Sequence, residues 1–387
     1  MTQGDYALIG GRLVLPDSIL EGASVIVQDG LIEAILERGT GLPAHLPVYD
    51  AEGAWVTPGL LELHIHGAGG VGFDDLGSDL ASSAASILRA RDFLRTRGVT
   101  CFVPTLVCRE AQISALAEAL ETAALPETEI PGIYVEGPFI SSSKRGGIPD
   151  DTISSADPKV LDRLLGIALG RLRMMTIAPE VPGAEEIMEA LTSKGILVCL
   201  GHSNCSLESA PLPRGDYSIT HLFNAMSPFS HKEAGLAMLP FIDHRPYVEL
   251  NADGVHVGET ALRAAALSLD PERIMLISDA VVAAGLPHGE YSYYGMRIVS
   301  GSDGVRYADT GILMGSNRLA PDVLRNWLRV TGTSIQRAVR ALSLTPARAL
   351  GLADRRGAIR VGLAADLVVW EGDFDSVRRI FGRGQPE

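Results

Sequence analysis

The sequence predicts a (β/α)8 barrel with a small β-sandwich domain built from both ends of the chain. Between residues 58 and 345, short apolar runs of β type alternate with longer helix-like stretches. Such alternation implies parallel strands, and eight units fit a closed barrel better than an open sheet. Outside this region, brief apolar runs punctuated by glycine at residues 6–35 and 357–372 indicate a separate set of short strands. We therefore expect the small domain to span residues 1–55 and 350–387, and the barrel to span residues 56–349.

Eight apolar runs carry the barrel prediction. Parallel strands with both faces covered are expected to be short and almost continuously apolar. In chain order the runs are LLELHIHG (60–67), VTCFVPTL (99–106), GIYVEGPF (132–139), LRMMTIAPE (172–180), ILVCLGHS (196–203), YSITHLFNA (217–225), YVELNADGVHV (247–257) and RIMLISDA (273–280). The stretches at residues 78–98 and 182–195 have the character of the intervening helices.

Charge and composition exclude two classes of partner. The chain has 33 Lys and Arg against 47 Asp and Glu, which gives a net charge of −14. Because a nucleic acid or an anionic membrane needs a basic face, we expect neither as a partner. No run approaches the roughly 18 apolar residues of a membrane span, and the N-terminal stretch lacks the regions of a signal peptide. The four cysteines form no CxxC pair, so we expect reduced thiols in a cytoplasmic protein.

Polar residues of an unusual kind follow five of the apolar runs. In a barrel, the chemistry lies at the C-terminal ends of the strands, which meet on one face. Imidazole nitrogens and carboxylate oxygens are ligands for Zn²⁺, Fe²⁺ or Mn²⁺. Residues i and i+2 of a strand point to the same side, so the two histidines of LELHIHG are expected to face one ion together. The predicted metal ligands are His64, His66, Glu136, His202, His221 and Asp279.

Each of these residues, taken alone, also has an ordinary structural explanation. Two histidines one residue apart are common in a chain of this size. Asp279 precedes AVVAAG, where it would serve as a helix N-cap, and His221 in THLFN would be a hydrogen-bonded core histidine. All these explanations would have to hold together across five strands, so the pattern favours a shared metal site.

The motifs resemble the amidohydrolase superfamily and, more narrowly, the N-acetylglucosamine-6-phosphate deacetylase family. They span the whole barrel in the family's order: PGLLELHIHG at 58–67, EGPF at 136–139, GHS at 201–203, THLFNAM at 220–226, DGVH at 253–256, SDA at 278–280 and LMGS at 313–316. The family's small β-sandwich, built from both termini, agrees with the domain prediction. The resemblance implies hydrolysis of N-acetylglucosamine 6-phosphate to glucosamine 6-phosphate and acetate.

The resemblance also implies a metal centre of two divalent ions per chain. Glu136, His202 and His221 would hold the principal metal. His64 and His66 would add a second ion, since family members that lack this pair use one. Glu136 would then bridge the two ions. Zinc is the first expectation, with iron or manganese as alternatives.

The catalytic and substrate-binding roles come from the same resemblance. Asp279 would be the catalytic group, accepting a proton from the attacking water and returning it to the leaving amine. Family members are commonly dimers, which implies a homodimer. The residues expected to contact the substrate are Gly147, Asn224, Ala225, Lys232, His256, Leu313, Met314 and Gly315.

Two positions depart from the family's pattern. Lys232 stands where the family usually has an arginine that helps to bind phosphate, and lysine lacks the bidentate fork. Ile148 stands where the family has a histidine that contacts the acyl end of the substrate. Isoleucine donates no hydrogen bond, so another group or the second metal must polarise the carbonyl.

These departures leave alternative functions open. One alternative is an amidohydrolase that acts on a different N-acetylhexosamine phosphate, an unphosphorylated N-acetyl sugar or an N-acyl amino acid. The other is a non-catalytic scaffold that kept the barrel. Such scaffolds tend to lose metal ligands, whereas all six predicted ligands are present here.

Overall fold

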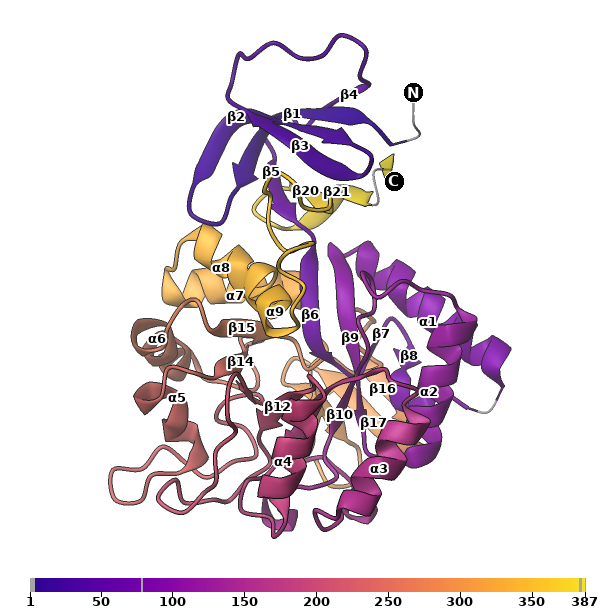
Figure 1. The fold of residues 1–387 in the computed structure, drawn as a ribbon, viewed down its shortest axis with the longest axis vertical. Helices are drawn as coiled ribbons and strands as arrows, with labels where there is room; N and C mark the ends of the chain where they lie inside the picture. Colours follow the sequence, from indigo (N-terminus) through magenta and orange to yellow (C-terminus); the bar gives the residue numbers. More distant parts are fainter. Residues whose placement is uncertain (1–3, 78, 383–384, 387) are drawn as a thin grey trace.

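A computed structural model describes residues 4–77, 79–382 and 385–386 of the chain. It consists of a parallel barrel, a smaller sheet at one end of the barrel and a third sheet inserted near the other end (Figure 1). The predicted fold class is confirmed. The division at residues 55 and 350 stays a prediction about domains. In the described part of the chain, no helix has the length and apolar character needed to span a membrane.

The barrel contains the eight predicted strands, and all of them are parallel. Their order in the sheet follows the chain, from β6 at one edge to β15 at the other. An isolated parallel bridge between Ile65 and Ala280 joins these two edges and closes the barrel. The strands are β6 (Leu60–Ile65), β9 (Val99–Val107), β10 (Ile133–Glu136), β11 (Leu172–Ile177), β12 (Leu197–Leu200), β13 (Ser218–Ile219), β14 (Tyr247–Asn251) and β15 (Ile274–Ile277).

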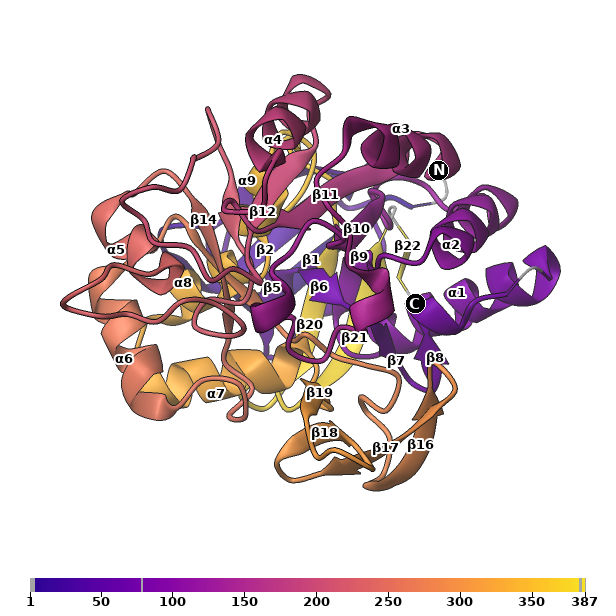
Figure 2. The same ribbon diagram turned by 90° about the horizontal axis from the view of Figure 1, so that it is seen from below.

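Helices cover the outside of the barrel (Figures 1 and 2). Asp79 caps the first of them, where its carboxylate accepts a hydrogen bond from the Ser82 amide. The α-helices are α1 (Leu80–Arg95), α2 (Glu110–Thr122), α3 (Pro158–Ile167), α4 (Ala184–Ser193), α5 (Leu239–Ile242), α6 (Glu259–Ser268), α7 (Ala320–Thr331), α8 (Ile335–Ala341) and α9 (Leu344–Ala349). Short 3₁₀ turns are η1 (Phe73–Asp75), η2 (Ser142–Lys144), η3 (Asp150–Thr152) and η4 (Leu236–Met238).

Both faces of the barrel strands are buried, which explains their continuous apolar character. The outward residues pack under the helices in the largest hydrophobic cluster of the molecule. The inward residues form another cluster that fills the barrel. Ala347 and Leu352 belong to this cluster and close the end of the barrel that faces the small sheet. The barrel is therefore a packed core, and only the C-terminal ends of its strands are available for chemistry.

A β-bulge in β6 decides where its histidines point. Leu61 and Leu63 lie in the interior cluster, so strict alternation would direct residue 65 inward as well. The pairing with β9 instead shifts between Glu62 and Ile65, and Ile65 packs on the outer side. The extra residue turns His64 and His66 toward the barrel mouth. Bulges commonly re-aim side chains next to active sites.

The small sheet combines strands from both ends of the chain. It has the order β22-β21-β20-β5-β1-β2-β3, with β4 paired to β1. The two expected layers are parts of one continuous sheet, because β5 pairs with both β1 and β20. These strands are β1 (Tyr6–Val14), β2 (Ile19–Gln28), β3 (Leu31–Leu36), β4 (Val48–Asp50), β5 (Trp55–Pro58), β20 (Leu367–Glu371), β21 (Ser376–Gly382) and β22 (Gln385–Pro386).

An antiparallel sheet follows β15, at the end of the barrel away from the small sheet (Figure 1). We call it the insert sheet, and the sequence analysis did not predict it. Its strands are β16 (Gly289–Tyr293), β17 (Met296–Gly301), β18 (Gly304–Tyr307) and β19 (Leu313–Gly315). A hairpin of β7 (Gly67–Ala68) and β8 (Val71–Gly72) also lies near this end.

A buried ion pair joins the small sheet to the base of the barrel. Arg356, which is 5% exposed, donates hydrogen bonds to the Asp366 carboxylate and to the Thr100 hydroxyl in β9. Thr100 donates to the same carboxylate at 2.7 Å. Gly59 lies against this group, since a Cβ there would approach Thr100 Oγ1 to 2.0 Å. The ion pair therefore fixes the short connection from β5 to β6, the strand that carries His64.

Replacing Asp366 with asparagine should destabilise the protein strongly. The substitution keeps the shape of the side chain but leaves the Arg356 charge buried without its partner, which typically costs about 3–5 kcal/mol. Chemical denaturation of the wild type and Asp366→Asn would measure the loss. Glu290→Gln is the matched control, because it breaks an exposed ion pair with Arg297 and should cost about 0–1 kcal/mol. Similar losses in the two variants would contradict a structural role for the buried pair.

Candidate metal centre

The six predicted metal ligands converge at the C-terminal end of the barrel. They come from β6 and the residue after it, from the end of β10, and from the residues that follow β12, β13 and β15. All six are buried, and they fall into two groups of three. Within each group, the three ligand atoms lie within 4.8 Å of one another. The first ligand group is Glu136, His202 and His221, and the second ligand group is His64, His66 and Asp279.

The first ligand group is tightly clustered. Nε2 of His202 and Nε2 of His221 each lie 2.9 Å from Glu136 Oε1. The same two nitrogens are 3.0 Å apart. Two imidazole nitrogens and one carboxylate oxygen thus surround one small volume, as the ligands of a single cation do.

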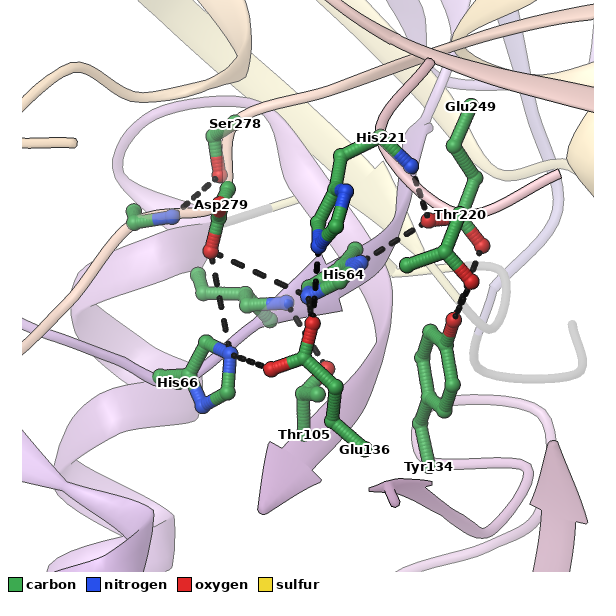
Figure 3. Close-up of polar contacts among 12 residues, drawn as sticks. His64, His66, Thr105, Tyr134, Glu136, Thr220, His221, Glu249, Ser278 and Asp279 are labelled. Atoms are coloured by element: carbon green, nitrogen blue, oxygen red, sulfur yellow. Dashed lines mark hydrogen bonds and ion pairs between the residues drawn. The ribbon is translucent and has the colours of Figure 1, made fainter. Parts of the chain in front are cut away.

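The second ligand group also faces the Glu136 carboxylate (Figure 3). His66 Nε2 is 3.5 Å from Glu136 Oε2 and 3.7 Å from Asp279 Oδ1. His64 Nε2 is 3.8 Å from Glu136 Oε1 and 3.8 Å from Asp279 Oδ1. Glu136 therefore faces both groups, which is the arrangement expected of a bridging carboxylate.

The donor set fits a divalent metal. His64 Nε2 is buried and has no hydrogen-bond partner among the described residues, although it points at two carboxylates. A buried polar atom without a partner is costly, and coordination of a cation would satisfy it. Imidazole nitrogen and carboxylate oxygen are the ligands that zinc takes in catalytic sites.

The electrostatics of the centre also favour a cation. Burial opposes ionisation of Glu136, but the imidazoles of His202, His221 and His66 hold its pKa well below the usual range. Burial alone would lower the pKa values of His64 and His66. The surrounding carboxylates outweigh it and raise these values to about 9 and about 10. The site thus stabilises positive charge although its side chains are almost fully buried.

Three of the six ligands are held in left-handed backbone conformations. The φ angles are 45° at His202, 28° at His221 and 52° at Asp279. Such conformations cost non-glycine residues about 1–3 kcal/mol each and cluster at functional sites. Hydrogen bonds hold the Asp279 conformation, since its amide donates to the His64 carbonyl and its carbonyl accepts from the Ser316 amide.

The ordinary explanations for single residues do not hold. Asp279 is followed by a bridge and turns, not by a helix that it would cap. His221 is not a satisfied core histidine, because its Nδ1 has no hydrogen-bond partner among the described residues. Instead, His221 Nε2 faces Glu136, and Asp279 Oδ1 faces His64 and His66.

A cavity of about 280 Å³ opens above the metal ligands. Six of the eight predicted substrate contacts line it: Gly147, Asn224, Ala225, His256, Leu313 and Met314. Gly315 lies behind the wall, where a Cβ would meet Val281 at 2.6 Å. Lys232 is exposed and does not line the cavity. The roles of these residues stay predictions.

The structure places His256 beside the predicted catalytic acid. Its Nε2 lies 3.4 Å from Asp279 Oδ2, and its Nδ1 donates to Asp253 at 2.8 Å. Burial opposes the charge of His256, yet Asp253 and Asp279 raise its pKa. Asp253 was missed by the sequence analysis, although it opens the DGVH motif.

Two further buried acids near the histidines were also missed. Glu249 in β14 accepts a hydrogen bond from His64 Nδ1 at 2.8 Å, and Asp74 in η1 lies 3.6 Å from His66 Nδ1. Glu249 had a detectable signal, because it is a charged residue inside the apolar run YVELN. Asp74 had none, since it stands in the polar stretch FDDLGSD.

Comparisons with known proteins agree with this geometry. The model of the amidohydrolase family matches residues 55–386. N-acetylglucosamine-6-phosphate deacetylase of Bos taurus is 34% identical over 87% of this chain and 84% of its own length. N-acetylgalactosamine-6-phosphate deacetylase of Escherichia coli O157:H7 is 30% identical over 98% of both chains. Among solved structures, a mutant N-acetyl-D-glucosamine-6-phosphate deacetylase from Mycobacterium smegmatis, in complex with N-acetyl-D-glucosamine-6-phosphate, superposes with a TM-score of 0.85 at 28% identity, covering 99% of both chains.

Proposed function

The chain belongs to the amidohydrolase family and, within it, to the N-acetylglucosamine-6-phosphate deacetylases, and from this membership we propose that it deacetylates N-acetylglucosamine 6-phosphate. The products are glucosamine 6-phosphate and acetate. One observation of the site carries the proposal: the buried Glu136 faces the four histidines of the two ligand groups, and Asp279 of the second group also lines the cavity above them. Amidohydrolases are metal-dependent, and the six ligands suit that chemistry.

Two divalent ions per chain are proposed, with zinc first and iron or manganese as alternatives. The first ligand group would hold one ion and the second ligand group the other, with Glu136 between them. Bound there, the ions would lower the pKa of the attacking water and polarise the amide carbonyl. The support for two ions is the pair of ligand groups and the unpartnered His64 Nε2.

Asp279 is proposed as the proton carrier. Its Oδ1 faces His64 and His66, and its Oδ2 faces His256 at 3.4 Å, so the carboxylate stands between the ligands and the cavity wall. From this place it can take the proton of the attacking water and return it to the departing amine, which is the work of one group acting as base and then acid.

Ile148 in the cavity wall supports the need for a metal at the carbonyl. Isoleucine offers no hydrogen bond to the substrate. Tyr294 and Tyr307 also line the cavity, but the Tyr294 hydroxyl donates to Asp74 at 3.0 Å and the Tyr307 hydroxyl donates to the Gly147 carbonyl at 2.9 Å. This part of the cavity wall therefore offers the acetyl carbonyl no free hydroxyl, and bound ions would supply the polarisation.

The phosphate group needs a cation from outside the cavity of one chain. Among the described residues that line the cavity, none is a lysine or an arginine. Lys232 lies on an exposed loop, and the same region exposes Phe229 and Ile242, which are 53% and 61% exposed. We therefore propose a homodimer in which this apolar region is covered and Lys232 of the partner subunit reaches the substrate phosphate.

The four free cysteines support a reducing, cytoplasmic location.

Asp279→Asn tests the proposed function directly. The wild type should release acetate from N-acetylglucosamine 6-phosphate. The variant keeps the side-chain shape, and asparagine tolerates the left-handed backbone at this position. Loss of the proton carrier should lower kcat by at least the roughly 10²–10⁴-fold typical of general acid–base catalysis. Acetate production that is absent in the wild type would refute the function, and a near-normal rate in the variant would remove Asp279 from the mechanism.

Lys232→Ala tests the phosphate contact. A charge-assisted hydrogen bond contributes about 1.5–3 kcal/mol, so kcat/KM on the phosphorylated sugar should fall about 10- to 150-fold. The unphosphorylated sugar should be little affected, and Lys232→Arg should retain phosphate use. Lys194→Ala, which removes an exposed lysine at the end of α4, is the control. Equal kinetics of the wild type and Lys232→Ala on the phosphorylated sugar would show that this lysine does not bind phosphate.

A further inference from the structure

We propose that two buried carboxylates, Glu249 and Asp74, are positioning residues for the metal ion of the second ligand group. Glu249 stands behind His64 and Asp74 stands behind His66, each facing Nδ1 of its imidazole. Neither acid lines the cavity, so neither is placed to touch the substrate. The inference rests on the proposed binding of two ions and concerns how the chain prepares one of the two positions.

Glu249 fixes the orientation of His64. The carboxylate is fully buried in β14, and its Oε2 accepts the hydrogen bond from His64 Nδ1 at 2.8 Å (Figure 3). With the proton held on Nδ1, the lone pair of His64 is on Nε2. That nitrogen points toward Glu136 and Asp279 and has no hydrogen-bond partner among the described residues. A carboxylate behind a metal-binding imidazole sets its tautomer and raises its basicity in this way.

Glu249 is itself held rigidly by its neighbours. The Tyr134 hydroxyl donates to its Oε1 at 3.3 Å and is also bonded to Thr176 and Thr220. The His221 amide donates to its Oε2 at 3.4 Å. A side chain held by Tyr134 of β10 and by the His221 amide after β13 cannot turn away easily, so several strands of the barrel together set the position of His64.

Asp74 faces His66 Nδ1 at ion-pair distance without a hydrogen bond, and the insert sheet holds this acid in place. Its Oδ2 lies 3.6 Å from His66 Nδ1 and accepts hydrogen bonds from the Tyr293 and Tyr294 hydroxyls at 2.8 and 3.0 Å. Its Oδ1 accepts from the Val107 amide at 3.1 Å. The end of β16 thus supports a metal ligand through one buried acid. This gives the insert sheet a function at the centre in addition to its place in the cavity wall.

The first ligand group has no such support, which makes the proposal selective. His202 Nδ1 donates to the backbone carbonyl of Lys144 at 2.8 Å. His221 Nδ1 has no hydrogen-bond partner among the described residues. Charged acids therefore stand behind the imidazoles of only one of the two ligand groups in the described structure. Removing their charge should weaken one metal position and spare the other.

Metal titration of the metal-free protein tests this inference without any substrate. Zn²⁺ would be added to the wild type, Glu249→Gln and Asp74→Asn, with calorimetry for the affinities and elemental analysis for the final count. The wild type should bind two ions. Each variant should bind one ion as the wild type does and the other about 10- to 100-fold more weakly, the usual effect of losing a residue behind a metal ligand.

Two controls separate positioning from general stability. Tyr134→Phe removes one hydrogen bond to the Glu249 carboxylate but keeps the carboxylate charge, its hydrogen bond from His64 and the aromatic ring beside His64, so it should weaken the second ion much less than Glu249→Gln does. In a His64→Asn background, Glu249→Gln should have no further effect on metal binding, because the acid acts through the imidazole.

The outcomes distinguish this inference from the proposed function. An equal loss at both positions in Glu249→Gln, or no loss at either, would overturn the positioning role. A further loss from Glu249→Gln in the His64→Asn background would also overturn it. A wild type that releases acetate yet binds a single ion would refute the two-ion centre, and with it this inference, while the deacetylase function would stand.

Discussion

The whole site depends on the burial of one carboxylate between two sets of imidazoles. Glu136 is 5% exposed and faces nitrogens of all four histidines of the two ligand groups within 3.8 Å. A buried charge of this kind is expensive unless it is compensated on every side. The compensation requires that β6, β10, β12, β13 and β15 end at the same level, which a closed barrel of parallel strands provides.

Several costly local features follow from that constraint. The bulge in β6 turns His64 and His66 toward Glu136, and the left-handed backbone at His202, His221 and Asp279 brings those side chains over the barrel mouth. The hydrophobic packing inside the barrel and under its helices stabilises the fold enough to offset the free energy that this backbone strain costs. The same rigidity keeps the ligand atoms close together and favours a fixed metal geometry.

Much of this arrangement is predictable from the sequence, for physical reasons. The eight strands are recognisable because burial on both faces makes them continuously apolar, and the six ligands stand out because they interrupt that pattern at strand ends. The bulge leaves no such signal, since alternation from Leu61 predicts the opposite side for residue 65. The insert sheet has strands with one exposed face, so they lack the continuously apolar runs by which the barrel strands are recognised.

The supporting acids show a different limit. Glu249 interrupts an apolar strand and could be recognised as unusual, but its partner His64 is far away in the chain and only the fold brings them together. Asp74 lies among other polar residues, and its role depends on two tyrosines from the insert sheet. His256 is part of a recognisable motif, yet its contact with Asp279 follows from the geometry of β14 and β15.

A diffraction experiment on crystals of the zinc-reconstituted protein, recorded at the zinc absorption edge, would show directly whether Glu136 lies between two ions. Anomalous scattering locates metal ions without assumptions about their ligands. We expect two peaks on opposite sides of the Glu136 carboxylate, separated by the roughly 3.5–4 Å typical of two-metal sites. One peak should lie beside His202 and His221, and the other beside His64, His66 and Asp279. A single peak at full occupancy, with His64 and His66 bound to no ion, would contradict this arrangement.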